Sequence, residues 1–473
     1  MKKKFYSLLS KISIKYILLF LFLLYLSGLI VPYISHKKVN EAFQSSFHSR
    51  EFYGTSAGTE RTAYLDDNSE ALLYRLRMIE EAESDIILST FDFNSDQSGK
   101  DILAALNNAA GRGVNVRIIV DGISGFLDLR HDEWFQTAAA HPNIQIRIYN
   151  PVNFLKPWKL QARLHDKYLV IDKKMYLLGG RNTTNLFLGD YSSSRNIDRE
   201  LFVYETEESP DSSLYQLLDY FEHVWNLEDS KAYTCTQSAK KTGEYNAKLC
   251  TNYDTLRQKY PSAWESWDWL HLTFETNRIS LLYNPAEAEN KEPWMWYSLH
   301  QLMAQGDQVS IYTPYIICGK EMYQDLESLT QNKTKVEIIT NDVAKGANPW
   351  GCTDYLNQKK QIWNTGVNVY EFMGKHSCHT KAVVIDDRMS IVGSYNLDMR
   401  STYQDTELML AVDSPKLNQI IRKEIETDKT FSKTMTGDGY VYGENYKAKE
   451  MTTGKKIFYA FLRIVVIPIR RFL

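Results

Sequence analysis

Cysteine is scarce in this sequence, and its few cysteines do not have the spacing of metal ligands. The chain of 473 residues has five, and no two of them form the Cys-x2-Cys pair of a structural zinc site. No carboxylate cluster or mixed Cys/His set takes their place. We therefore expect neither a metal nor another cofactor. Cys235 and Cys250 flank a short polar stretch, and two alternatives stay open for them: a disulfide in an extracytoplasmic domain, or two free thiols.

The sequence also lacks a surplus of positive charge. Its formal net charge is −3 and its pI is about 6.4, whereas proteins that bind nucleic acid usually carry a basic footprint. We therefore expect no nucleic-acid partner. With 44% hydrophobic and 24% charged residues, the composition is typical of a folded protein, and the chain is long enough for two sizeable cores.

Near the N-terminus a long apolar stretch has no charged residue. Residues 16–34 read YILLFLFLLYLSGLIVPYI, which is long enough to cross a bilayer as a helix. A cleaved signal peptide and a buried core helix are the alternatives. The apolar part of a signal peptide is shorter, however, and no Ala-x-Ala-like cleavage site follows. We therefore expect a membrane anchor.

Lysines on the two sides of this stretch predict its orientation. Before it stand Lys2, Lys3, Lys4, Lys11 and Lys15, and after it Lys37 and Lys38. The more positive flank of a membrane helix usually stays in the cytoplasm. We therefore expect a single-pass protein of the cell membrane, with its N-terminus in the cytoplasm and the rest of the chain outside.

One segment of the sequence occurs twice. Residues 164–182 read LHDKYLVIDKKMYLLGGRN, residues 378–396 read CHTKAVVIDDRMSIVGSYN, and the two align without a gap. The shared positions pair His165 with His379, Lys167 with Lys381, Asp172 with Asp386, Gly179 with Gly393 and Asn182 with Asn396. Further on, DRELFVYE at 198–205 resembles DTELMLAV at 405–412. Chance duplication of this pattern is very improbable, so we predict a duplicated structural unit.

Similar elements surround each copy. Residues 85–91, 114–120 and 144–149 are predicted strands and 100–110 a helix, and the second copy repeats the order with strands at 308–312, 335–340 and 367–372 and a helix at 321–331. Apolar strands that alternate with helices are typical of an α/β fold. We predict two α/β halves related by a pseudo-two-fold axis, preceded by a transmembrane helix.

The predicted boundaries follow from the repeat. Residues 1–40 form the stub and anchor, 41–230 the first half, 231–275 a polar connecting insertion, 276–445 the second half and 446–473 a basic apolar tail. In the tail, Arg463 interrupts the apolar run and Pro468 would break a helix, so we do not expect a membrane span. We expect instead a helix lying in the membrane interface, and the alternative is a final helix packed on the second half.

The duplicated polar residues suit the transfer of a phosphodiester. One of the histidines, His165 or His379, can attack phosphorus while the other protonates the leaving alcohol, because imidazole titrates near neutral pH. Lys167 and Lys381 follow two residues later on the same face of a strand, where they supply positive charge to the phosphate oxygens. Two half-sites that meet across the pseudo-two-fold axis would make one whole site.

Other positions of the repeat are expected to support this chemistry. Asn182, Asn396 and Ser394 are predicted to donate hydrogen bonds to the substrate, and Gly180 to offer its backbone N–H. Asp172 and Asp386 complete the motifs and are grouped with the catalytic residues. Their odd offset from the histidines places them on the opposite strand face, however, so we expect them to brace the strand or its turn. Glu200 and Glu407 are predicted to orient the histidines, as a carboxylate fixes an imidazole tautomer.

The full pattern, H-x-K-x4-D-x6-G-[GS]-x-N in two copies with a downstream Asp-x-Glu, resembles the phospholipase D superfamily. GSYNLDMRS at 393–401 is similar to bacterial cardiolipin synthases, and LGGRN at 178–182 to a related branch. The resemblance implies two α/β halves with both motifs at their interface and a ping-pong mechanism through a phosphohistidine. It implies that His165 is the nucleophile and His379 the general acid and then base. Gly180 departs from the pattern, because many members have serine there.

For a cardiolipin synthase, the resemblance implies phospholipid substrates and a membrane. One phosphatidylglycerol would give its phosphatidyl group to the enzyme and release glycerol, and a second would accept the group to form cardiolipin. With water as the acceptor the protein would be a phospholipase D that produces phosphatidic acid. A phosphodiesterase or nuclease of the same superfamily is less favoured, because of the acidic balance and the anchor, and so is a non-catalytic membrane scaffold.

Overall fold

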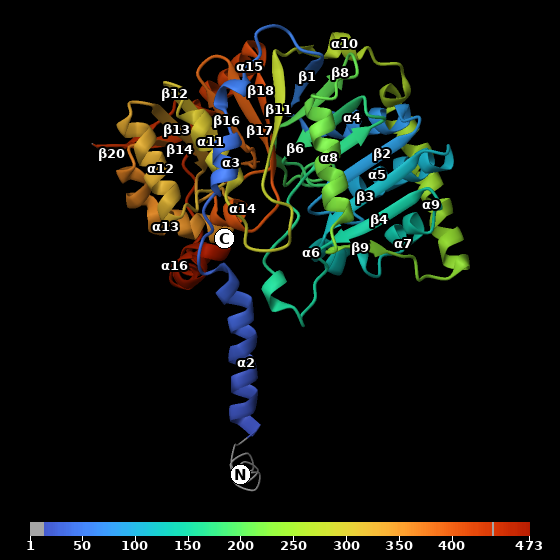
Figure 1. Cartoon of the computed structure of the whole chain (residues 1–473), viewed down its shortest axis with the longest axis horizontal. Helices are drawn as coiled ribbons and strands as arrows, with labels where there is room; N and C mark the ends of the chain where they lie inside the picture. Colours follow the sequence, from blue (N-terminus) through green and yellow to red (C-terminus); the bar gives the residue numbers. More distant parts are fainter. Residues whose placement is uncertain (1–13, 438) are drawn as a thin grey trace.

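The computed structural model describes residues 14–437 and 439–473. The chain forms two α/β halves side by side, and a single helix projects from them (Figure 1). This helix, α2 (Ile14–Ile30), continues into a 3-10 turn (Val31–Tyr33) and has no buried residue. Among the described residues it is the one helix long and apolar enough to cross a membrane. The predicted cytoplasmic lysines Lys2, Lys3, Lys4 and Lys11 lie outside the described residues.

The two halves contain sheets in which eight strands follow the same order, and each sheet has one further strand, at opposite edges. The first sheet runs β10 (Phe274–Glu275), β1 (Glu60–Leu65), β8 (Glu200–Glu205), β6 (Met175–Gly179), β5 (Tyr168–Ile171), β2 (Asp85–Thr90), β3 (Asn115–Asp121), β4 (Ile144–Tyr149) and β9 (Ser230–Tyr233). The second runs β11 (Arg278–Tyr283), β18 (Leu408–Asp413), β17 (Met389–Gly393), β16 (Ala382–Ile385), β12 (Gln308–Tyr312), β13 (Lys335–Asn341), β14 (Asn368–Phe372), β19 (Ser432–Thr436) and β20 (Gly439–Tyr442). In each sheet three strands are parallel, β2-β3-β4 and β12-β13-β14. The predicted duplicated α/β fold is confirmed.

Helices cover the outer faces of both sheets. The first half has α4 (Asn68–Glu81), α5 (Gln97–Gly111) and α7 (Glu133–Ala139), and the second has α11 (Trp294–Met303), α12 (Lys320–Gln331) and α13 (Pro349–Asn364). Aspartate side chains cap the N-termini of two helices in the first half. The side chain of Asp67 accepts hydrogen bonds from backbone N–H groups at the start of α4, and that of Asp96 accepts one at the start of α5. Such caps satisfy N–H groups that have no partner within the helix.

A shared apolar core joins the halves between the inner faces of the two sheets. It includes α8 (Ser213–Asn226) and α15 (Pro415–Thr430), one from each half. On α8 the buried residues recur at helical spacing as Leu214, Leu217 and Phe221, and on α15 as Leu417, Ile421 and Ile425. Burying these faces against the sheets fixes the halves relative to each other.

The predicted insertion, residues 231–275, belongs structurally to the first half. It contains a helix, α9 (Ala239–Lys259), whose Leu249, Tyr253 and Leu256 are buried where it packs on α5 and α7. Its end supplies β10, the outermost strand beside β1. Cys235 and Cys250 are free thiols in the structure.

The C-terminal tail forms helix α16 (Thr453–Ile469), which packs on α13. Tyr459, Leu462 and Val466 are buried against the second half. Pro468 is the last residue but one of α16, so the helix ends directly after it, as expected for a residue that cannot continue helical hydrogen bonding. One face of the tail is therefore packed on the second half, as in the alternative expectation of a packed final helix.

Candidate active site

The two predicted histidines meet at the seam between the halves. His165 lies shortly before β5 and His379 shortly before β16, and each backbone is held by the opposite half. The N–H of His379 donates to the carbonyl of Ile197 at 2.6 Å, and the N–H of His165 donates to the hydroxyl of Thr406 at 3.1 Å. Two short strands, β7 (Asn196–Ile197) and β15 (Ser377–Cys378), also pair across the seam. The motifs are thus assembled only when both halves fold together.

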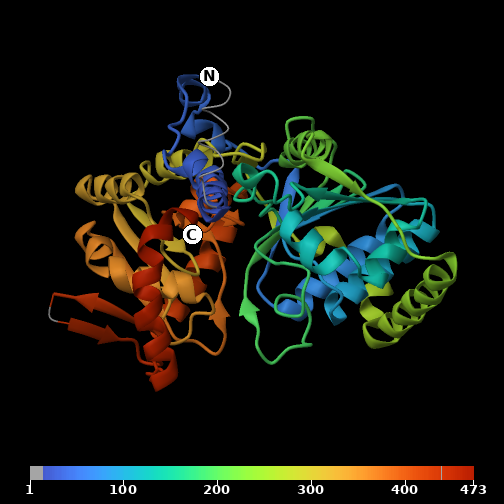
Figure 2. The same cartoon turned by 90° about the horizontal axis from the view of Figure 1, so that it is seen from below.

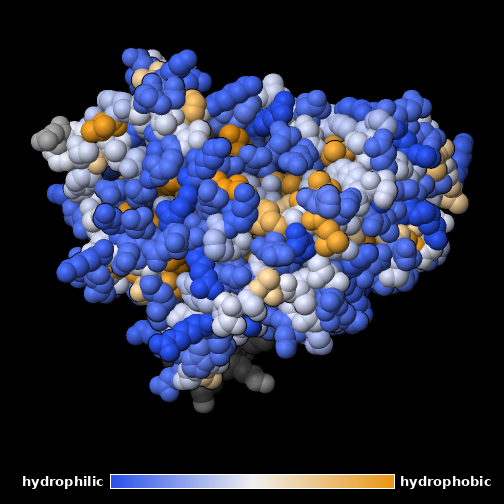
Figure 3. Space-filling model, turned by 90° about the horizontal axis from the view of Figure 1, so that it is seen from above, coloured by the Kyte–Doolittle hydropathy of each residue, from blue (hydrophilic) through white to orange (hydrophobic). Residues whose placement is uncertain are grey.

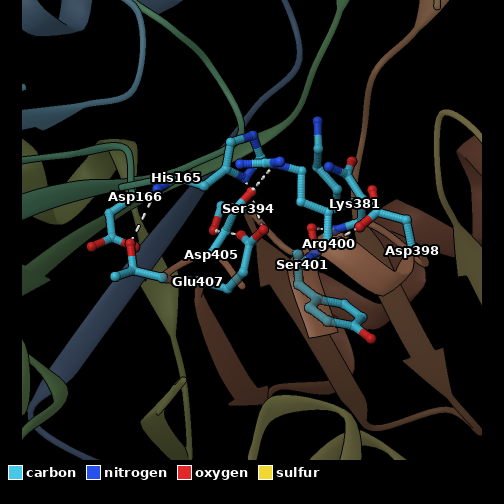
Figure 4. A network of polar contacts seen from close by, with 12 residues as sticks. His165, Asp166, Lys381, Ser394, Asp398, Arg400, Ser401, Asp405 and Glu407 are labelled. Atoms are coloured by element: carbon cyan, nitrogen blue, oxygen red, sulfur yellow. Dashed lines mark hydrogen bonds and ion pairs between the residues drawn. The ribbon is translucent and has the colours of Figure 1, made fainter. Parts of the chain in front are cut away.

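His165 is oriented by a carboxylate of the second half. Its Nδ1 lies 2.8 Å from Oε1 of Glu407 (Figure 4). The Ser394 hydroxyl donates to the other oxygen of Glu407, and the Ser394 N–H donates to a backbone carbonyl. Ser394 therefore positions Glu407, and the expectation that it binds substrate stays a prediction. The prediction for Glu407 agrees with this contact.

His379 is oriented by a carboxylate of the first half, Asp198, which the sequence did not single out. Nδ1 of His379 lies 2.7 Å from Oδ2 of Asp198, and the ammonium of Lys381 lies 3.4 Å from the same oxygen. Burial by itself raises the pKa of Asp198, but Lys381 and His379 outweigh it and lower the pKa to about 2. The Asp198 carboxylate is therefore ionised at neutral pH, where it favours a protonated His379.

Glu200 does not orient a histidine, so that prediction is wrong. Its two carboxylate oxygens accept hydrogen bonds from the guanidinium of Arg75 at 2.6 and 2.7 Å. The reason lies at Gly180, which aligns with Ser394. A Cβ on Gly180 would come within 2.4 Å of Asp198, so the missing side chain leaves the space that the Asp198 carboxylate fills.

The two lysines lie buried beside the histidines. Lys167 donates to the backbone carbonyl of His165, and Lys381 to that of His379. Burial lowers the pKa of Lys167 to about 7 and also lowers that of Lys381. Burial and then the lysine charges hold the pKa of His165 well below its usual range, and burial and Lys381 lower that of His379 to about 4. A bound phosphate would neutralise this positive field and raise these values.

Asn182 and Asn396 occupy equivalent positions in the two halves. Both are almost fully buried, and in the described part of the chain their side-chain carbonyls accept no hydrogen bond. A buried carbonyl without a protein partner is suited to a donor group of a ligand, whereas the N–H groups of the same amides are suited to a phosphate oxygen. Both residues therefore remain candidates for substrate binding.

Asp172 and Asp386 stand apart from this site. The Asp172 carboxylate accepts hydrogen bonds from the backbone N–H groups of Glu83, Ser84 and Asp85, beside the turn that follows β5. Asp386 accepts two equivalent bonds, from the backbone N–H groups of Asp307 and Gln308 at the start of β12. The catalytic grouping of the two aspartates is therefore wrong, and the expected bracing role is the one observed.

Two phenylalanines that pack against the histidines were not predicted from the sequence. Phe91 packs edge-on against His165, with ring centroids 5.4 Å apart, and Phe187 packs in the same way against His379 at 4.9 Å. Asp166, next to His165 in the chain, points instead towards the shared core, where it accepts a hydrogen bond from Tyr220 at 2.8 Å (Figure 4). The sequence gave no signal for the two phenylalanines.

Comparisons with known proteins agree with this geometry. Cardiolipin synthase C of Escherichia coli (strain K12) is 23% identical over 407 residues, 76% of this chain and 82% of that protein. Minor cardiolipin synthase ClsB of Bacillus subtilis (strain 168) is 23% identical over 369 residues, 76% and 79% of the two chains. The crystal structure of phosphatidylserine synthase from Haemophilus influenzae Rd KW20 has the same fold, with a TM-score of 0.60 at 17% identity over 89% of this chain and 97% of that chain.

A family comparison divides its match between the two halves. Residues 76–225 and 299–429 match the family described as cardiolipin synthase, PLD-like domain. Each matched segment contains one of the two histidines, and together they cover more than half of the chain. This protein therefore belongs to the cardiolipin synthase family with the PLD-like domain, and it is an enzyme of the phospholipase D superfamily.

Proposed function

We propose that this protein is a phosphatidyltransferase that makes cardiolipin from two molecules of phosphatidylglycerol. The observation that carries the proposal is the composite site, in which each histidine is held by a carboxylate of the opposite half. With Nδ1 of both rings engaged, the two Nε2 atoms are proposed to carry the chemistry, and Nε2 of His379 lies 3.2 Å from the ammonium of Lys381. The apolar helix α2 and the cardiolipin synthase relatives support a lipid substrate.

In the first half-reaction, His165 is the nucleophile. Its lowered pKa keeps the ring neutral, and its Nε2 attacks phosphorus. The P–N bond forms as the P–O bond to glycerol breaks, and His379 gives its proton to the glycerol oxygen. The ionised Asp198 supports this assignment, because it stabilises the protonated state that His379 needs.

In the second half-reaction, the roles of His379 reverse. The neutral ring takes the proton from a hydroxyl of the second phosphatidylglycerol, and that oxygen attacks phosphorus as the P–N bond breaks. Lys167 and Lys381 offset the charge on the phosphate oxygens in both steps. Asn182 and Asn396 are proposed to hold the same oxygens through their amide N–H groups.

We propose that the catalytic part lies on the outer side of the cell membrane, since lysines are concentrated before α2. Cys250 is exposed on α9, so it reports on this orientation. An impermeant thiol reagent should label it in intact cells. Labelling only after lysis would place the catalytic part in the cytoplasm.

The function is tested with radiolabelled phosphatidylglycerol and the enzyme in detergent. Cardiolipin with released glycerol is expected from the wild type and from neither His165→Ala nor His379→Ala. Phosphatidic acid without cardiolipin would make the protein a hydrolase at the same site. If the folded protein gives no lipid product, the proposal fails.

A further inference from the structure

Large apolar side chains are exposed in the first half around a loop that follows β4. They belong to two neighbouring segments and comprise Ile123, Phe126, Leu127, Phe154, Leu155 and Trp158. Leu155 is 87% exposed and Leu127 70%. Solitary exposed apolar residues are ordinary, but a contiguous group of them marks an interaction surface. We call this group the loop patch.

The second half exposes a similar group on the outer face of α16. While one face of this helix is buried, Ile457, Phe458, Phe461, Ile464 and Ile467 point away from the protein, each at least 50% exposed. The spacing of three and four residues makes a continuous apolar stripe. We call it the helix patch.

Both patches lie where α2 joins the rest of the protein. The Tyr33 hydroxyl, at the end of the apolar segment, donates to the carbonyl of Trp158 at 2.9 Å. On the other side, the Tyr33 ring packs edge-on against Phe472, just beyond α16, and Arg471 donates to the carbonyl of Ile34. Figures 1 and 2 show α16 at the base of the second half, next to the point where α2 leaves it. The face opposite α2 is largely hydrophilic, with small apolar areas (Figure 3).

Positive charge accompanies both patches. The loop patch borders a hollow of about 600 Å³ lined by Arg130, Lys156, Lys159 and Lys231, and the one acidic residue there, Asp229, is paired with Lys159 at 2.6 Å. Lys455, Lys456 and Arg463 lie on α16. Exposed apolar side chains among cations are the chemistry that binds an anionic bilayer surface.

We propose that the catalytic body docks on an anionic bilayer through the loop patch and the helix patch, one from each half, on either side of α2. Docking at two points on opposite sides of an anchor fixes the tilt of the body. It also holds the site near the lipid, because Trp158 and His165 are separated by so little chain that they lie at most about 25 Å apart. The inference concerns orientation and does not depend on which lipid reacts.

The test uses the full chain with an environment-sensitive fluorophore on single cysteines. Leu155→Cys and Phe461→Cys report on the two patches, in a background where the accessible Cys235 and Cys250 are serine. The matched control is Leu272→Cys, an exposed leucine (43%) on α10 (Trp269–Leu272), which Figure 1 places at the end away from α2. Each protein is reconstituted in vesicles that contain phosphatidylglycerol, with and without lipids that carry a nitroxide quencher.

The expected result is a blue-shifted emission that the lipid-borne quencher reduces at positions 155 and 461, and no such change at 272. If 155 and 461 behave like 272, the body does not dock and the proposal is overturned. If one patch responds and the other does not, two-point docking is overturned. A blue shift that persists in detergent, together with a doubled mass, would assign the patches to contacts between copies of the chain. Because the readout is fluorescence, it stands even if no transferase activity is found.

Discussion

The substitution Asp198→Asn tests which carboxylate orients His379. In the structure this residue is Asp198, whereas the aligned sequence predicts Glu200. Asparagine keeps the shape of Asp198 but removes its charge beside His379 and Lys381. In a serine-protease triad the same change lowers turnover about 10⁴-fold, because the histidine loses its orienting carboxylate. For Asp198→Asn we therefore expect a fall in kcat of between about 10² and 10⁴.

The same substitution has a stability consequence with a defined pH dependence. The pKa of Asp198 is lowered from 3.8 to about 2, which corresponds to about 2 kcal/mol of unfolding free energy at neutral pH. Because the folded-state pKa is depressed, this stability is present above pH 3.8 and is lost as the pH falls towards 2. The variant should unfold more easily than the wild type at pH 7, and the difference should shrink in acid.

Glu200→Gln is the matched control. It weakens the buried pair with Arg75 and should cost about 3 kcal/mol in stability, yet it leaves both histidines with their carboxylates. Kinetics per folded enzyme, with the folded fraction taken from urea titration, compare the two variants. The reasoning is refuted if Glu200→Gln loses as much kcat as Asp198→Asn when both are folded.

Three further predictions concern the space beside Gly180, the hydrogen bonds of Asp172 and the pH dependence of catalysis. Gly180→Ser should lower kcat at least tenfold, because its Cβ would displace the Asp198 carboxylate, and steady-state kinetics would contradict this if turnover were unchanged. Asp172→Ala should lower the unfolding free energy by about 2–4 kcal/mol, since three backbone N–H groups lose a charged acceptor. Denaturant unfolding measures this loss. The kcat per folded enzyme should stay within about twofold of the wild-type value. Because burial and Lys381 lower the pKa of His379 to about 4, the protonated acid becomes scarce above that pH, so kcat/KM should fall from about pH 4 upwards. The limb of kcat should lie at higher pH, because a bound phosphate raises the pKa of His379. A kcat/KM that is maximal above pH 8 would contradict the last prediction.

The repeated motif was enough to predict most of the fold and the two histidines of the candidate site. Two gap-free copies of one pattern led to two sheets in which eight strands follow the same order, and the motif spacing pointed to the two histidines that meet at the seam. The fold prediction is confirmed because motif spacing and strand periodicity are local properties of the chain. The expected placement of His and Lys within a strand is wrong, since both pairs lie just before β5 and β16. The odd offset of Asp172 and Asp386 likewise indicated their bracing role.

The carboxylates that orient the two histidines could not both be predicted from the sequence pattern. DRE at 198–200 and DTE at 405–407 align, so the sequence makes Glu200 and Glu407 equivalent. In the structure the equivalence breaks because Gly180 lacks the side chain that Ser394 has, and Asp198 takes the space. That outcome depends on packing between residues distant in sequence. Helix α9 was missed for a different reason, since its buried Leu249, Tyr253 and Leu256 form a narrow stripe in a polar segment.

The central claim is a single site shared by the two halves, with His165 as the nucleophile, and trapping the covalent intermediate tests it most directly. The enzyme is mixed with phosphatidylglycerol labelled in the phosphate, quenched in alkali to preserve a P–N bond, and digested for mass spectrometry. We expect the phosphatidyl group on His165, no label in His165→Ala, and no release of glycerol from that variant. A phosphatidyl group on His379 would reverse the assignment, and glycerol release that survives in His165→Ala would contradict the shared site.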